Sequence, residues 1–120
     1  MRILVVEDDR LVRDYVLAQL HSLGYATLSA ANADGALDIV RSKAPFDLLF
    51  TDIIMPGSMN GRQLADAIAA EQPQLKVLFT SGYTEDAIIH HGRLDSGVLL
   101  LAKPYRKSEL ARMIRRALEG

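Results

Sequence analysis

The sequence predicts an α/β domain in which one parallel sheet of five strands is covered by helices on both faces. Short apolar runs alternate with segments of helical periodicity along the 120 residues without interruption. Most of these runs are apolar almost throughout, as is typical of strands that are buried on both sides. Strands that alternate with helices require right-handed crossovers, and the result is a doubly wound parallel sheet.

Five apolar runs are candidate strands, and four of them lack a polar face. They occupy residues 3–6, 26–30, 47–51, 76–80 and 98–101. Only the run at 26–30, with the sequence ATLSA, alternates between apolar and polar side chains. That alternation predicts an edge strand.

The first two helix patterns have recognisable ends. Apolar side chains spaced by three and four residues extend from Val12 to Leu23, and Gly24 follows where a left-handed cap is favoured. The second pattern begins after Asn32, a good N-cap residue, and carries its apolar side chains within residues 36–40. We therefore expect a helix after each of the first two strands.

The remaining helix patterns differ in strength. One extends from about residue 61 to residue 71 and ends before Pro73, and a shorter one could begin at a Thr84 cap. The last is the clearest, because an apolar stripe lies beside a face rich in arginine. The stripe carries Leu110, Met113, Ile114, Ala117 and Leu118, and the solvated face carries Arg112, Arg115 and Arg116.

Length and composition narrow the function classes. We expect one domain over residues 1–120, because a chain of this size can bury roughly two-thirds of its unfolded surface. The 14 basic and 15 acidic residues give a formal net charge of −1 without a basic cluster, so we expect no nucleic-acid or membrane partner. Cysteine is absent, which excludes disulfides and thiolate metal sites. No apolar run is long enough for a signal peptide or a membrane span, so we expect a soluble cytoplasmic protein.

Polar side chains follow four of the candidate strands. Ligands of doubly wound folds collect beyond the carboxyl ends of the strands, so these residues are candidates for a site. Carboxylates that converge there repel one another unless a proton or a cation lies between them, and Mg²⁺ prefers such oxygen ligands. A purely structural alternative is that Asp9 and its acidic neighbours form the N-cap and first turn of a helix. This alternative explains Asp9 well, but it does not explain why Asp52 would be buried. The strand ends carry Glu7-Asp8-Asp9, Thr51-Asp52, Thr80-Ser81-Gly82 and Lys103-Pro104.

Four motifs, in this order and spacing, resemble the receiver domain of two-component response regulators. They are VVEDD at 5–9, DIIMPGSMNG at 52–61, TSG at 80–82 and KPY at 103–105. The resemblance covers essentially the whole chain, and residues 83–105 are most similar to receivers that stand alone or belong to hybrid sensor kinases. It implies a flavodoxin-like (βα)₅ fold with strand order 2-1-3-4-5. It also implies a phosphorelay module that is not a turnover enzyme.

The resemblance assigns a role to each candidate site residue. Asp52 would be the nucleophile that takes a phosphoryl group from a histidine kinase or a histidine phosphotransfer protein and loses it slowly to water. Mg²⁺ would be held by Asp8 directly, by Glu7 through water, by Asp52, and by the backbone carbonyl of Ile54. The two remaining roles belong to Ser81, which would move toward the phosphoryl group, and to Lys103, whose amine would contact it.

Two features depart from the common pattern of this family. The loop after Pro56 is one residue longer than usual, and Asn60 stands where an acid is common. Leu100 stands three residues before Lys103, where many receivers carry a Tyr or Phe that changes rotamer on phosphorylation. Because leucine cannot make this switch, we expect phosphorylation to act through Ser81 and residues 81–86. We also expect a cis peptide bond before Pro104.

Other functions fit the sequence less well. A phosphohydrolase with an aspartate nucleophile needs a second Asp two residues later, where this chain has Ile54. A flavodoxin-like phosphate binder needs a Gly/Ser/Thr-rich loop after the first strand, where Glu7 and Asp8 would repel a phosphate. His90 and His91 point in different directions on a helix and cannot chelate one ion together. A degenerate receiver that only binds proteins remains the alternative.

Overall fold

The computed structural model describes residues 1–55, 57, 59–81 and 99–119. The predicted fourth helix at Thr84 and the pair His90-His91 lie outside these residues. From β1 to β4, strands and helices alternate as the sequence predicts. Their order is β1 (Arg2–Val6), α1 (Arg10–Ser22), β2 (Ala26–Ala30), α2 (Ala33–Arg41), β3 (Leu48–Asp52), α3 (Gly61–Glu71), β4 (Val77–Ser81), β5 (Leu99–Ala102) and α5 (Lys107–Glu119).

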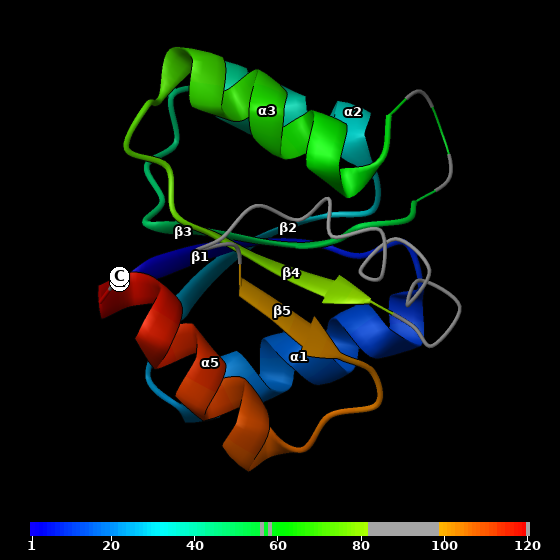
Figure 1. Ribbon diagram of the computed structural model, residues 1–120, viewed down its shortest axis with the longest axis vertical. Helices are drawn as coiled ribbons and strands as arrows, with labels where there is room; N and C mark the ends of the chain where they lie inside the picture. The colour runs from blue at the N-terminus through cyan, green and yellow to red at the C-terminus, as the bar shows by residue number, and fades with distance from the viewer. Residues whose placement is uncertain (56, 58, 82–98, 120) are drawn as a thin grey trace.

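The five strands form one parallel sheet in the order β2-β1-β3-β4-β5. This confirms the expected fold class and strand order, and it places β2 at an edge as its alternating sequence predicts. Figure 1 shows α2 and α3 on one face of the sheet and α1 and α5 on the other. Among the described residues, no helix has the length and apolar character that a membrane crossing requires.

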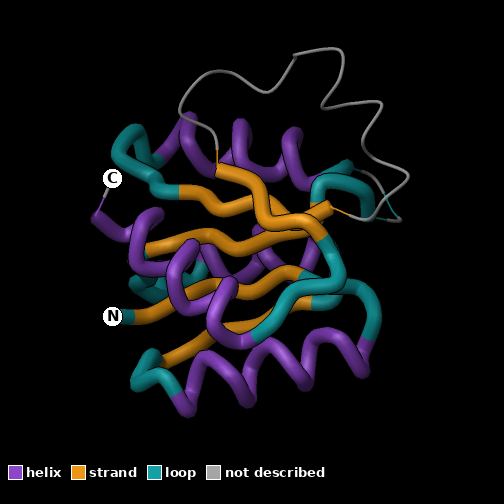
Figure 2. The backbone as a smooth tube through the Cα atoms, turned by 60° about the horizontal axis from the view of Figure 1, so that its bottom comes forward, coloured by secondary structure: helices purple, strands orange, loops and turns teal. Residues whose placement is uncertain are grey.

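Alternate residues of each strand enter two separate cores, because successive side chains of a strand point to opposite faces. The sheet lies between the two helix layers that enclose these cores (Figure 2). The α2/α3 core includes Leu4, Val6, Leu49 and Phe79 from the strands. The α1/α5 core includes Ile3, Val5, Phe50, Leu78 and Leu101.

Strands β3 and β4 each lie one residue further along the chain than the sequence predicted. Strand β1 begins one residue earlier than predicted, and β5 ends one residue later. We expected 47–51 and 76–80, whereas β3 and β4 span Leu48–Asp52 and Val77–Ser81. The reason is sheet pairing, because Asp52 pairs with Thr80 and Ser81 pairs with Ala102. The polar residues at these ends therefore belong to the sheet and take fixed directions from it.

The helix ends follow local capping chemistry. Gly24 has a φ of +94°, as predicted for the residue beyond the C-cap of α1. The Asn32 side chain caps α2 as expected, accepting a hydrogen bond from the amide of Gly35. Asn60 forms a reciprocal capping box with Gln63 at the start of α3. Asn60 thus provides the N-cap that an acid would provide at this position.

Candidate functional site

Four polar side chains project from the carboxyl ends of four strands toward the α1/α5 face of the sheet. The parity of each strand explains this, because Asp52 follows the direction of Phe50, and Thr80 follows that of Leu78. Glu7 and Lys103 continue the same alternation beyond β1 and β5. These four side chains are therefore brought together by the sheet itself.

Lys103 connects the two buried carboxylates of this group. Its Nζ lies 2.9 Å from Oε1 of Glu7 and 2.7 Å from Oδ1 of Asp52. Glu7 is 5% exposed and Asp52 is 4% exposed. Because a buried carboxylate without a partner is costly, the ammonium group is what makes this burial tolerable. The predicted cis peptide bond between Lys103 and Pro104 is confirmed.

Burial and neighbouring charges shift the titration of this cluster. Burial raises the pKa of Glu7, and the Asp52 carboxyl raises it further, while Lys103 opposes the change. Burial alone would lower the pKa of Lys103, but its hydrogen bonds to Asp52 and Glu7 outweigh this and raise the pKa. Lys103 therefore stays charged beside the two carboxyl groups.

Asp8 completes a cluster of three carboxylates. Oxygen atoms of Glu7, Asp8 and Asp52 all lie within 4.8 Å of one another, and Asp8 is the exposed member. Burial raises the pKa of Asp8, and its hydrogen bond and charge interaction with Glu7 raise it further. Hard divalent cations prefer oxygen donors in this arrangement, so the donor set fits Mg²⁺. Among the residues that the structure describes, no imidazole belongs to the cluster.

The backbone of Asp52 is supported from the opposite face of the sheet. The hydroxyl of Thr51 donates a hydrogen bond of 3.0 Å to the carbonyl oxygen of Asp52. Gly61 lies against the same oxygen so closely that an added Cβ would stand 1.8 Å from it. The Gly61 amide also donates to the carbonyl of Ile53 at 2.7 Å. Only glycine can occupy position 61 without displacing the backbone of the nucleophile candidate.

The start of α1 orders the acidic pair. Asp9 caps the helix, because its carboxylate accepts hydrogen bonds from the amides of Leu11 and Val12. The amide of Asp9 donates to Oε2 of Glu7 at 3.0 Å, and the Arg13 guanidinium donates to the Glu7 carbonyl at 2.7 Å. The helix-cap interpretation therefore holds for Asp9, and the cap also positions Glu7.

Comparisons with known proteins agree with this geometry. The family model of the response regulator receiver domain matches residues 3–115. The chain belongs to this family. It is 32% identical to the response regulator receiver protein CpdR of Brucella abortus (strain 2308), over 98% of this chain and 96% of CpdR. It is 33% identical to the sensor kinase CckA of the same strain, over 98% of this chain and 12% of CckA.

Solved structures add support for the fold. A response regulator receiver protein from Sinorhizobium medicae WSM419 superposes with a TM-score of 0.88 at 20% identity, covering 100% of this chain and 95% of that one. The receiver domain therefore spans nearly all of a stand-alone relative and a small part of a sensor kinase. As a receiver domain, it is a signalling module of two-component systems.

Within the part of the chain that the structure describes, the remaining predicted site residues of this receiver domain make no hydrogen bond or ion pair with the three carboxylates. Leu100 packs against the α2/α3 core, on the face opposite to Lys103. Ile54 follows Asp52 in the loop and is 50% exposed. Ser81 is fully buried, and its hydroxyl has no hydrogen-bond partner among the described residues. The roles assigned to these three residues stay predictions.

Sequence reasoning placed Thr80 at a strand end but assigned it no role in the site. Its hydroxyl donates a hydrogen bond of 2.5 Å to Oδ1 of Asp52. The motif TSG directed attention to Ser81, but the pairing of Asp52 with Thr80 puts Thr80 on the face of the nucleophile candidate. Strand parity is the signal that could have found it, once the strand bounds were known.

The interior beneath the polar side chains is filled, with Tyr105 and only a small cavity beside them. The Tyr105 ring packs edge-on against Phe50, with ring centroids 6.4 Å apart. Burial raises the pKa of Tyr105, and the charges of Glu7 and Asp52 add to the effect. A cavity of only about 10 Å³ lies among Glu7, Asp52, Thr80 and Tyr105. The receiver site is therefore a shallow rim of polar atoms over a filled interior.

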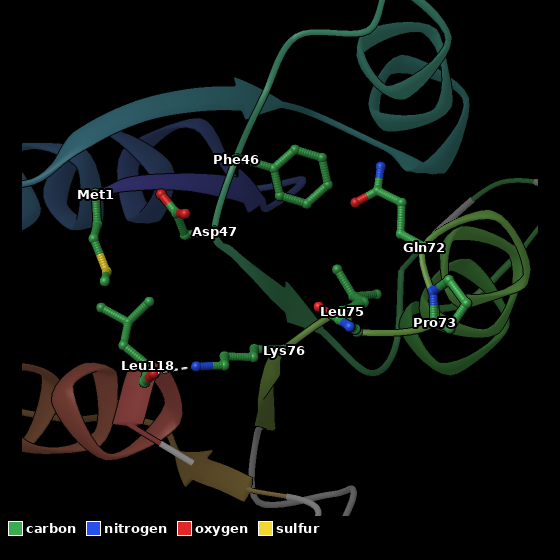
Figure 3. A pocket seen from close by; sticks show the side chains of 9 residues that line it. Met1, Phe46, Asp47, Gln72, Pro73, Leu75, Lys76 and Leu118 are labelled. Atoms are coloured by element: carbon green, nitrogen blue, oxygen red, sulfur yellow. Dashed lines mark hydrogen bonds between the residues drawn. The ribbon is translucent and has the colours of Figure 1, made fainter.

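A larger hollow of about 520 Å³ lies at the opposite, amino-terminal end of the sheet. Figure 3 shows Phe46 and Leu75 in this hollow, with the ammonium group of Lys76 bonded to the carbonyl of Leu118. It contains none of the four side chains that meet at the carboxyl ends of the strands. Size alone therefore does not identify the site in this fold.

Proposed function

We propose that this receiver domain accepts a phosphoryl group on Asp52 from a phosphohistidine and thereby changes its affinity for a partner. One observation carries the proposal. Asp52 is 4% exposed and ends a central strand, yet its carboxylate is charge-paired with Lys103 and clustered with two other carboxylates. A structural role alone does not account for a cluster of three carboxylates of which two are buried.

Mg²⁺ is the cofactor that this donor set fits. Asp8 and Asp52 would bind it through carboxylate oxygens, Glu7 through a water molecule, and Ile54 through its backbone carbonyl. When bound, the ion supplies positive charge that offsets the repulsion between the carboxylates and an incoming phosphoryl group. The proposal of direct and water-mediated ligands follows the family pattern on these residues.

The protein's own residues account for the remaining chemistry. The Asp52 carboxylate is the nucleophile, and Lys103 holds it in place before transfer. After transfer, the Lys103 ammonium and the Ser81 hydroxyl would each bind a phosphoryl oxygen. Burial of the Ser81 hydroxyl without a partner supports this, because such a group gains a hydrogen bond when it turns toward the phosphoryl group.

The phosphoryl donor would be a histidine kinase or a histidine phosphotransfer protein in the cytoplasm. Its imidazole must reach Asp52, so the donor must cover the rim beside Lys103. The surface next to this rim is apolar, and its exposed side chains include Leu11, which is 80% exposed, and Tyr15, which is 42% exposed. Replacing Leu11 with Ser should slow transfer from a phosphotransfer protein but leave labelling by acetyl phosphate unchanged. Equal slowing of both reactions would contradict this docking site.

Intact mass spectrometry after incubation with acetyl phosphate tests the proposed function. The wild-type protein should gain about 80 Da, one phosphoryl group, in Mg²⁺ and not in chelator. Asp52→Asn removes the nucleophile and should show no gain under either condition. Equal labelling of wild type and Asp52→Asn, or labelling that ignores the chelator, would favour the alternative of a binding-only receiver.

A slow loss of phosphate separates this module from a phosphohydrolase. The residue two positions after the nucleophile is Ile54, which cannot act as a general acid or base. The phosphorylated protein should therefore persist long enough to act as a signal, and turnover of acetyl phosphate should be poor. Steady release of phosphate in many turnovers would contradict the assignment as a signalling module.

A further inference from the structure

The hydroxyl of Thr80 is the one side-chain hydroxyl that the structure places on the Asp52 carboxylate among the described residues. It donates to Oδ1 at 2.5 Å, and Thr80 is 3% exposed. Lys103 reaches the same oxygen at 2.7 Å. Both contacts therefore fall on Oδ1, and the second carboxylate oxygen of Asp52 receives neither of them.

Sheet register explains why Thr80, and not Ser81, makes this contact. Asp52 and Thr80 are direct partners across β3 and β4, so their side chains project from the same face. Ser81 is the next residue and projects toward the α2/α3 face. Its hydroxyl is buried without a partner among the described residues. The two adjacent hydroxyls thus occupy different environments on opposite faces of the sheet.

Two donors on one oxygen restrict rotation of the carboxylate. Turning the Asp52 side chain about its terminal bond would exchange the two oxygens and break both contacts. The contacts therefore leave the second oxygen without a donor from Thr80 or Lys103, and oxygens of Glu7 and Asp8 lie within 4.8 Å of the Asp52 carboxylate. A buried hydrogen bond to a charged group is strong enough to bias such an orientation.

We propose that Thr80 is a positioning residue that orients the nucleophilic carboxylate of Asp52 for phosphoryl transfer, a role that rests on the proposed function. In the reaction with acetyl phosphate, an Asp52 oxygen forms a bond to phosphorus. The bond between phosphorus and the acetyl oxygen breaks, and acetate leaves with the electron pair. Thr80 forms no bond to the phosphoryl group in this step. It holds the carboxylate so that the reactive oxygen needs no reorientation.

The test compares labelling rates of Thr80→Val and Thr80→Ser at saturating Mg²⁺. Thr80→Val keeps the side-chain shape and removes the donor, so labelling by acetyl phosphate should slow about tenfold, as expected for losing one hydrogen bond to a charged group. Thr80→Ser keeps the hydroxyl and should label within about threefold of wild type. Thr27→Val is the matched control, because Thr27 lies on the edge strand β2, where its hydroxyl contacts His21 of α1. It should label at the wild-type rate.

The outcomes separate positioning from mere structural support. A wild-type rate in Thr80→Val, or equal slowing in Thr80→Ser and Thr80→Val, would overturn the proposal. If Thr80→Val does not fold, as judged by its thermal melt, Thr80→Ala and Thr80→Ser give the same comparison of hydroxyl against no hydroxyl. Failure of the proposed function itself would appear differently, as labelling that persists in Asp52→Asn.

Discussion

The two faces of the sheet hold Asp52 in different ways. On the α1/α5 face, Lys103 and Thr80 hold the carboxylate through charge and hydrogen bonding. On the α2/α3 face, Thr51 and Gly61 hold the backbone carbonyl through a hydrogen bond and a close contact. The first set of contacts depends on protons, cations and phosphate, whereas the second depends on shape. Packing thus fixes the backbone of Asp52, while the electrostatic interactions of its carboxylate can still change.

Among the contacts to the Asp52 backbone on the α2/α3 face, replacing Gly61 with Ala should cause the largest loss of stability. Its Cβ would stand 1.8 Å from the Asp52 carbonyl oxygen, which is backbone and cannot turn aside. We expect the free energy of unfolding to fall by roughly 2–4 kcal/mol and labelling by acetyl phosphate to be lost or severely slowed. Urea denaturation and intact mass measure the two effects.

Gly35→Ala is the control for this substitution. An added Cβ at Gly35, inside α2, meets no atom closer than 3.4 Å. Alanine favours a helix over glycine by about 0.5–1 kcal/mol, so stability should stay equal or rise slightly. If Gly61→Ala were as stable as Gly35→Ala, the close contact would not be what fixes the backbone of Asp52.

Among the contacts to the Asp52 carboxylate on the α1/α5 face, replacing Lys103 with Met should cause the largest loss of stability. It leaves the buried Glu7 and Asp52 without their cation, and the free energy of unfolding should fall by about 2–3 kcal/mol in chelator. The pKa of Lys103 is raised in the folded protein. The stabilisation that the charged lysine provides is therefore fully present below its ordinary pKa of 10.5 and is lost only at higher pH. The loss should therefore be the same at pH 6 and at pH 8.

Lys107→Met removes the same charge from an exposed position at the start of α5. It should change the free energy of unfolding by less than about 0.5 kcal/mol. Mg²⁺ should restore part of the stability of Lys103→Met, because it supplies charge to the same carboxylates. No response of Lys103→Met to Mg²⁺ would contradict the account of a shared anionic cluster.

Replacing Asp8 with Asn should stabilise the protein in chelator. The pKa of Asp8 is raised by burial and by Glu7, so its charged form disfavours the fold. The contribution of Asp8 to stability is therefore greatest below its ordinary pKa of 3.8, and it is lost as pH rises through the raised pKa of Asp8 in the folded protein. At pH 7 the free energy of unfolding of the variant should exceed that of wild type by less than about 1 kcal/mol, because water screens the exposed Asp8, and this difference should shrink toward pH 4.

Mg²⁺ should stabilise wild type and have little effect on Asp8→Asn, because the variant lacks a charged ligand. Thermal melts in chelator and in Mg²⁺, repeated across pH, measure both trends. An Asp8→Asn variant that is less stable than wild type at pH 7 in chelator would show that charge repulsion does not dominate at this rim.

Replacing Thr51 with Val should have the smallest effect. It removes one neutral hydrogen bond to the Asp52 carbonyl and keeps the branched shape, so the free energy of unfolding should fall by about 1 kcal/mol. Labelling by acetyl phosphate should slow by less than about threefold, whereas Thr80→Val, on the α1/α5 face, should slow it about tenfold. Equal slowing by the two threonine variants would remove the distinction between the faces.

The sequence by itself determined the order of the elements and the chemistry of the rim. Local periodicity and capping predicted α3 at residues 61–71 and β2 at residues 26–30, with the bounds that the structure has. The motifs predicted Glu7, Asp8, Asp52 and Lys103 as neighbours, because the carboxyl ends of parallel strands meet at one edge. These properties depend on residues close together in the chain or on a general rule of the fold.

Only the tertiary structure decided which hydroxyl meets the carboxylate and which glycine touches its backbone. A difference of one residue in strand register reverses the face of every side chain, and no local pattern separates Thr80 from Ser81. Gly61 meets Asp52 at the start of α3, where the Gly61 amide donates to the carbonyl of Ile53. Both contacts join atoms that are distant in the chain, and their geometry depends on packing between whole elements.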